Sequence, residues 1–229
     1  MKSNTDPEKA RLVRTPIAMI CGALFVAAGS AALPGCNIVG PIVSVVHGPE
    51  KAQAVYRLDP TKKTVIFVDD PANKIAQRRA RAQIGDAAQT ELLRKKKIKD
   101  GNMIDTRSAM AVAANGDGSL SITEIGDAVG AEVIVYALVT RFDLTSDGVD
   151  LDPASEIEVK VFDVTTHTRI WPPAGEPGYR STFSGSGGNR FMPQSRTDSL
   201  RAQNELAKIT GLGFSQLFYD VEKQQSLRK

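Results

Sequence analysis

The apolar stretch Thr64-Val65-Ile66-Phe67-Val68, followed by Asp69-Asp70-Pro71, decides the fold. A continuous apolar run of this length that ends in turn-forming residues is typical of a strand buried on both faces. We therefore predict that it forms the central strand of a sheet with helices packed on it.

A long amphipathic helix is predicted directly after this strand. From about Asn73 to Lys96, apolar residues recur at spacings of three and four, which places them on one helical face. The outer face of this segment, residues 73–97, is basic. A solvated face is the ordinary interpretation, and contact with anionic lipid or polymer is the alternative.

The next notable segment resembles part of a calcium-binding loop. Asn115, Asp117 and Glu124 fall at loop positions three, five and twelve, but position one is Ala113, which offers no carboxylate. The alternative is a turn followed by a short helix that is capped by Ser121 and Glu124. The sequence leaves both the metal site and the capped helix open.

The second half of the chain reads as an antiparallel meander followed by a helix. Strands are predicted within residues 132–185, and Ser195 opens a last helix with apolar residues up to Val221. Prolines cannot sit in a central strand, so the stretch from Trp171 to Tyr179 contains an exposed loop. With a short strand at residues 102–105, the predicted order is β-α-β-α-β-β-β-α, a mixed α/β sheet in one domain, residues 64–222. Residues 223–229 are a polar tail.

The N-terminus has the layout of a secretory signal. Lysines and arginines come first, and an uncharged apolar run from Ile17 to Leu33 follows them. Pro34 and Gly35 end this run at the short limit for a membrane-spanning helix. We predict a signal peptide over residues 1–35, ahead of Cys36.

The run Leu33-Pro34-Gly35-Cys36 resembles the bacterial lipoprotein signal, although Pro34 departs from the usual small residue. The resemblance implies a diacylglycerol and an N-acyl chain, such as palmitate, on Cys36, with residues 36–63 as a lipidated tether. A buried cysteine in an apolar helix is the alternative. Two or three acyl chains would hold the mature protein firmly to a membrane.

The composition of the mature chain limits the kinds of partner and cofactor that it can have. Removal of residues 1–35 from the 229-residue chain leaves 194 residues with 25 Lys and Arg against 24 Asp and Glu, so nothing indicates a nucleic-acid partner. One cysteine then remains, which excludes a disulfide framework and a cysteine metal site. The sequence therefore implies no cofactor beyond the lipid.

No reaction class follows from the acidic or histidine residues. Asp69 and Asp70 follow the central strand, where open sheets often bind ligands, but an aspartate before proline is most often a turn or cap residue. His47 lies in the tether and His167 at a predicted hairpin turn. We expect a protein that is not an enzyme, and an enzyme based on Asp69 and Asp70 is the minor alternative.

Two short motifs give a family resemblance over about residues 64–221. Gly130-Ala131-Glu132 leads into an apolar strand, and Val161-Phe162-Asp163-Val164-Thr165 heads a hairpin to Ile170-Trp171. These look like the domain shared by curli-secretion-type and penicillin-binding-protein-activator lipoproteins, with Thr166-His167-Thr168 in place of the usual Thr-Gly. The resemblance implies an envelope lipoprotein that acts through protein contacts.

We therefore expect a lipid-anchored accessory protein outside the cytoplasmic membrane that binds another envelope protein. The sheet edge, or the loop between Trp171 and Tyr179, is the predicted contact. Asn37 after the cysteine favours the periplasmic face of the outer membrane if the organism has two membranes. The alternative is a binder of a small ligand, an ion or cell-wall polymer.

Overall fold

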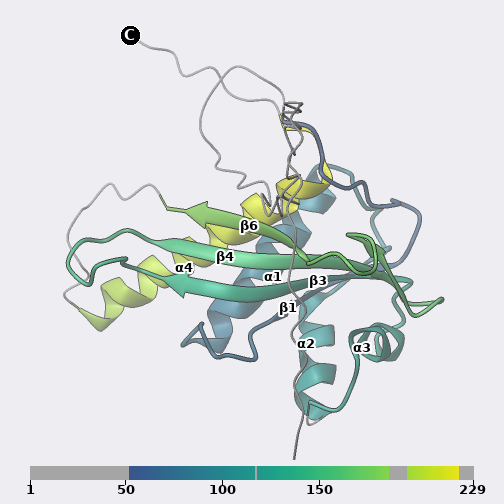
Figure 1. Ribbon diagram of the computed structural model, residues 1–229, viewed down its shortest axis with the longest axis horizontal. Helices are drawn as coiled ribbons and strands as arrows, with labels where there is room; N and C mark the ends of the chain where they lie inside the picture. Colours follow the sequence, from purple (N-terminus) through teal and green to yellow (C-terminus); the bar gives the residue numbers. More distant parts are fainter. Residues whose placement is uncertain (1–51, 117, 186–194, 222–229) are drawn as a thin grey trace, which may run out of the picture. The chain divides into compact units, whose positions relative to one another are not determined.

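The computed structural model describes residues 52–116, 118–185 and 195–221, and within these β1 (Thr64–Asp69) is the central strand (Figure 1). Residues 64–68 are all buried, with alternate side chains in two separate apolar clusters. The prediction of a strand buried on both faces is confirmed. The signal segment, Cys36 and the polar tail lie outside the described residues.

The sheet is mixed and has six strands. Its other strands are β2 (Met103–Ile104), β3 (Val133–Asp143), β4 (Ala154–Asp163), β5 (Thr168–Trp171) and β6 (Tyr179–Ser184). β1 pairs in parallel with β2 and β3, whereas β4 pairs antiparallel with β3, β5 and β6. The predicted mixed sheet with an antiparallel second half is confirmed. The predicted third strand of that half is two strands, β5 and β6, because the proline loop between them carries each to a different part of β4.

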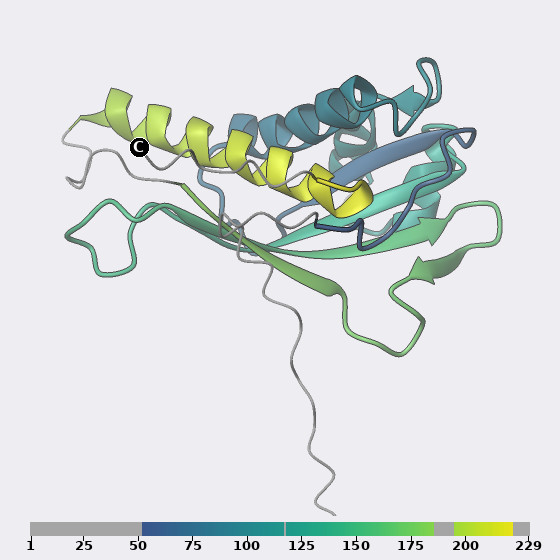
Figure 2. The same cartoon turned by 90° about the horizontal axis from the view of Figure 1, so that it is seen from above.

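Two helices cover one face of the sheet, α1 (Arg78–Arg94) and α4 (Arg196–Ser215), which continues as the short helix η1 (Gln216–Phe218) (Figure 2). The two helices are in close contact at Gly211, where an added Cβ would clash with the backbone carbonyl oxygen of Ile84. This contact explains a glycine inside a helix, where its low propensity costs about 1 kcal/mol relative to alanine.

The opposite face is covered by α2 (Thr106–Asn115) and α3 (Ile122–Ala128). The prediction was wrong about α2, because the sequence order placed no helix between the short strand and the loop at Asn115. Asp105 caps α2, and the buried hydroxyl of Thr106 donates to the carbonyl oxygen of Ile66 at 2.7 Å. That bond fixes the start of α2 on the edge of β1.

The predicted start of the first long helix was also wrong. Helix α1 begins at Arg78 instead of near Asn73, because Asp70 builds a turn between β1 and the helix. The carboxylate of Asp70 accepts from the backbone N–H groups of Lys74 and Ile75, both at 2.7 Å. Asn73 has a positive φ of 51°, which no α-helix accommodates.

Candidate functional site

The predicted contact region lies on the rim of the sheet, where β5 and β6 share one side of β4. β5 pairs with the end of β4, and β6 pairs with its first six residues, from Ala154 to Val159. The loop from Pro172 to Gly178 separates the two short strands, because Pro172 and Pro173 have no N–H to donate to a ladder. The predicted loop between Trp171 and Tyr179 is confirmed.

Three aromatic rings stack beside this loop. The ring centroids of Trp171 and Tyr179 are 5.1 Å apart, and those of Trp171 and Tyr56 are 5.4 Å apart. All three side chains are partly buried against the α1 and α4 face, and burial raises the pKa of Tyr179. Trp171 and Tyr179 thus contact each other and give the rim a rigid base.

Sequence reasoning missed Tyr56. It lies in the segment that enters the domain, which docks on the end of α4: the N–H of Tyr56 donates to the carbonyl oxygen of Leu217 at 3.1 Å, and Ala52 forms a β-bridge with Val221. An aromatic residue in the more polar second half of the tether was the available signal.

The loop and the neighbouring strand are braced by charged side chains. The guanidinium of Arg169 donates to the carbonyl oxygens of Pro173 and Glu176. On β4, the Glu158 carboxylate lies 2.7 Å from Nζ of Lys160 and 3.7 Å from Nε of Arg180. Burial raises the pKa of Glu158, but these cations and the N–H of Gly178 outweigh it, so the net shift is downward.

The outer side of this rim carries no further strand in the described ranges. Among the described residues, no strand pairs with β5 or β6 on the side away from β4. Ile170 on β5 is 39% exposed, one of four large apolar side chains with that degree of exposure in the described part of the chain. An exposed strand edge with unpaired N–H and C=O groups is a template for pairing with another chain.

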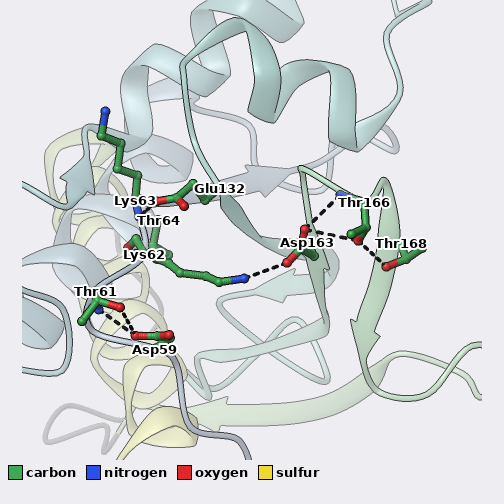
Figure 3. A network of polar contacts seen from close by, with 9 residues as sticks. All are labelled: Asp59, Thr61, Lys62, Lys63, Thr64, Glu132, Asp163, Thr166 and Thr168. Carbon is green, nitrogen blue, oxygen red and sulfur yellow. Dashed lines mark hydrogen bonds and ion pairs between the residues drawn. The ribbon is translucent and has the colours of Figure 1, made fainter.

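A polar network holds the β4–β5 hairpin to the start of β1 (Figure 3). The carboxylate of Asp163 accepts from Nζ of Lys62 at 2.8 Å and from the N–H of Thr166 at 3.0 Å. The hydroxyls of Thr166 and Thr168 lie 2.8 Å apart. Nearby, the carboxylate of Glu132 accepts from the N–H of Lys63 at 2.8 Å. The two motifs that carry the family resemblance therefore meet at one end of the sheet.

Asp69 and Asp70 do not form an isolated acidic pair. Asp70 is the cap of the turn before α1, as the ordinary interpretation of an aspartate before proline predicts. Asp69 accepts from the hydroxyl of Tyr136 at 2.9 Å and lines a hollow of about 250 Å³ between β1 and α3. Burial, followed by the Asp69 charge, raises the pKa of Tyr136. Both carboxylates have structural partners.

The described candidate ligands of the calcium-like loop belong to separate structural elements. Asn115 is the last residue of α2, and Asp117 lies outside the described residues. Glu124 and Ser121 form the predicted capping box of α3, in which the Glu124 carboxylate accepts from the N–H of Ser121 at 2.7 Å. Within the described ranges, no three His, Cys, Asp or Glu side chains gather in a way that could hold a metal ion.

His167 occupies the β4–β5 turn, where its φ is 53°. Its N–H donates to the carbonyl oxygen of Val164 at 3.2 Å, which closes the turn. A glycine is the usual residue at such a positive φ. His167 thus stands at a glycine-type turn position, and its imidazole is exposed, 3.8 Å from Asp127.

Leu33, Pro34, Gly35 and Cys36 lie outside the described residues, so the lipidation site stays a prediction. None of the helices in the described ranges has the length and apolarity needed to cross a membrane.

Comparison with known proteins gave only distant similarities. No protein-family model and no curated protein sequence matches this chain. Among solved structures, hypothetical protein CT253 from Chlamydia trachomatis covers 69% of this chain and 92% of its own, with 18% identity and a TM-score of 0.39. The match with lipoprotein GNA1162 from Neisseria meningitidis covers 62% of this chain and 94% of that protein's chain, with 10% identity and a TM-score of 0.39. The match with LpoB from E. coli covers 77% of this chain and 90% of that protein's chain, with 12% identity and a TM-score of 0.37. Similarities at this level do not assign the chain to a family, so the family resemblance stays a prediction.

Proposed function

We propose that this protein is a non-catalytic lipoprotein of the cell envelope that binds another envelope protein through the rim of its sheet. The rim consists of β5, β6 and the loop from Pro172 to Gly178. The observation that carries the proposal is the open edge of β5 and β6, with Ile170 exposed on it. Lipidation of Cys36 would hold the domain at the membrane surface.

The rim is suited to binding because it is already ordered. The stack of Tyr56, Trp171 and Tyr179 supports it from one side, and Arg169 holds the loop closed. A partner strand would therefore pair with a preformed edge, and the entropy cost of ordering would fall mainly on the partner. The candidate catalytic residues Asp69 and Asp70 both serve structural bonds, which favours binding over catalysis.

The test is photo-crosslinking in cells from a reactive amino acid placed at Ile170, combined with lysine substitutions. Ile170→Lys puts a charge on the edge, which natural proteins use to prevent strand pairing. Leu120→Lys is the matched control, because Leu120 is 37% exposed but lies beside α3. We expect one dominant envelope protein to crosslink from position 170, and its co-purification to be lost in Ile170→Lys and kept in Leu120→Lys.

Equal loss in both lysine variants, or no crosslink from position 170, would contradict the rim as the contact. The anchor is tested separately by Cys36→Ala, which should leave an unprocessed precursor or release the protein from membranes. Normal processing and membrane retention of Cys36→Ala would contradict lipidation.

A further inference from the structure

The basic residues of α1 form two groups instead of one continuous face. Arg78, Arg79 and Arg81 lie in the first turn, and Arg94 with Lys95, Lys96 and Lys97 lies at the other end. Between residues 82 and 93, the charged side chains are the two carboxylates of Asp86 and Glu91. The alternative of one basic ligand-binding helix face therefore does not describe the surface, and each end has to be considered by itself.

The lysines at the second end are displayed by the way α1 terminates. The N–H of Lys96 donates to the carbonyl oxygen of Leu93, and the N–H of Lys97 donates to that of Leu92, both at 2.9 Å. This is the Schellman pattern, and Lys96 has the left-handed φ of 53° that the pattern requires. Glycine usually occupies this position, so a lysine here adds charge at the expense of stability.

In the described part of the chain, these lysines form no ion pair, unlike Arg94 beside them. Arg94 is paired with Glu91 at 2.5 Å, and Nζ of Lys95 lies 5.5 Å from the ring centre of Tyr219. Among the described residues, none of Lys95, Lys96, Lys97 and Lys99, here called the lysine end, forms an ion pair. The carboxylates of Asp220 and Asp59 lie close enough to interact electrostatically with Lys97 and Lys99, and Asp220 also accepts from Arg57 at 2.8 Å.

The lysine end lies where the N-terminal segment enters the domain. Ala52 pairs with Val221, directly after Tyr219 and Asp220, and the N–H of Lys99 donates to the carbonyl oxygen of Pro60 at 3.2 Å. Figure 2 shows the first described segment, in dark blue, beside the yellow end of α4. Residues 37–51, between Cys36 and this point, can span at most about 50 Å.

We propose that the lysine end binds the anionic headgroups of the membrane that carries the Cys36 lipid, so that the domain stands on this end. The proposal rests on the proposed function, because the lipid supplies the first attachment and the lysines the second. The acyl chains on Cys36 would hold the protein at the membrane, and a basic cluster that faces an anionic surface adds an electrostatic attraction that orients the domain. Each lysine near an anionic surface contributes a factor of about five to the equilibrium constant.

The test uses the full lipidated chain in vesicles that contain a headgroup-linked quencher. One set is phosphatidylcholine alone, and the other also contains phosphatidylglycerol. A fluorescent amino acid at Asp100, next to the lysine end, reports on proximity to the surface, and a second reporter at Val149 marks the β3–β4 hairpin. The triple variant Lys95→Gln, Lys96→Gln, Lys97→Gln removes three charges. Its matched control, Arg78→Gln, Arg79→Gln, Arg201→Gln, removes three exposed charges elsewhere.

We expect quenching at position 100 only with phosphatidylglycerol, and its reversal by salt. The lysine triple variant should lower the ratio of surface-bound to unbound domain by about tenfold or more, and the arginine control should leave it unchanged. Equal quenching in both vesicles, equal effects of the two triple variants, or quenching at position 149 instead would overturn this proposal alone. Failure of the chain to float with either vesicle would overturn the Cys36 anchor as well.

Discussion

Nζ of Lys62 donates to Oδ2 of Asp163 at 2.8 Å, although 101 positions separate the two residues. Asp163 is nearly buried, with 12% of its side chain exposed, while 38% of the Lys62 side chain is exposed. The bond joins the segment before β1 to the β4–β5 hairpin, and so to the rim that we propose as the partner contact. It also lowers the pKa of Asp163 and raises that of Lys62.

We predict that this pair makes stability depend on pH in the acid range. Because the folded pKa of Asp163 is depressed, the pair stabilises the fold fully above the unfolded pKa of about 3.9 and progressively less as the pH falls through the folded value. Asp163→Asn should lower the free energy of unfolding by about 1–2 kcal/mol at pH 7. The deficit should shrink in urea unfolding at pH 3. A deficit that is the same at pH 3 and pH 7 would contradict this. Lys62→Met, alone and combined with Asp163→Asn, provides the double-mutant cycle.

Lys96→Gly should stabilise the protein by about 1 kcal/mol, because glycine adopts the left-handed φ at the end of α1 without a Cβ penalty. The control is Lys95→Gly, which removes the same charge at a negative φ of −83° and should give no such gain. Thermal unfolding of the two variants measures the difference. If Lys95→Gly gains as much as Lys96→Gly, loss of charge and not backbone strain is responsible.

Gly211→Ala should lower the free energy of unfolding, although helix propensity alone would raise it. Alanine is favoured over glycine in a helix by about 1 kcal/mol, but the added methyl would meet the backbone of α1 at Ile84 and force the helices apart. Overpacking of this kind costs about 1–3 kcal/mol, and backbone cannot yield as a side chain can. We expect a net loss in urea unfolding. Glu205→Ala, at an exposed position on the same helix, should change stability by less than about 0.5 kcal/mol. A stabilised Gly211→Ala variant would show that the two helices can separate without cost.

A buried hydroxyl pair links α4 to β4. The Oγ atoms of Thr210 and Ser155 are 2.5 Å apart, both residues are fully buried, and Thr210 also donates to the carbonyl oxygen of Leu206. Thr210→Val keeps the shape and leaves Ser155 without this partner, so it should cost about 1–3 kcal/mol. Adding Ser155→Ala should recover part of the loss, because the orphaned hydroxyl is then removed. Additive losses in the double variant would mean that the two hydroxyls do not act as a pair.

Several local features could be predicted because their causes are local. The apolar run at Thr64 to Val68, the capping box at Ser121 and Glu124, and the proline loop after Trp171 each follow from side chains within a few positions of each other. Helix α2 could not be predicted in the same way. It is ten residues long, and isolated helices of that length are marginal in water. It is held by Asp105 at its start and by the Thr106 bond to β1.

The residues of the candidate site also differ in whether local sequence indicates them. Trp171 and Tyr179 were selected from the sequence because they flank prolines and glycines. Tyr56 and Arg169 were missed, because their partners are distant in the chain or lie across the loop. The predicted start of α1 was too early because the helical spacing of apolar residues continues back to Ala76. In the structure, the Asp70 carboxylate binds the N–H groups of Lys74 and Ile75, so this backbone forms a turn instead of a helix. The spacing of apolar residues does not show that a side-chain turn competes with the helix for these residues.

The sequence by itself determined the central strand and the antiparallel second half of a mixed sheet, because apolar periodicity and turn chemistry act over a few residues. Only the tertiary structure decided that β5 and β6 share one side of β4, that Tyr56 stacks on Trp171, and that the lysine end lies beside the entry of the N-terminal segment. These relationships join residues that are distant in the chain. Their physical cause is the packing of the two helix layers on the sheet, which no local pattern encodes.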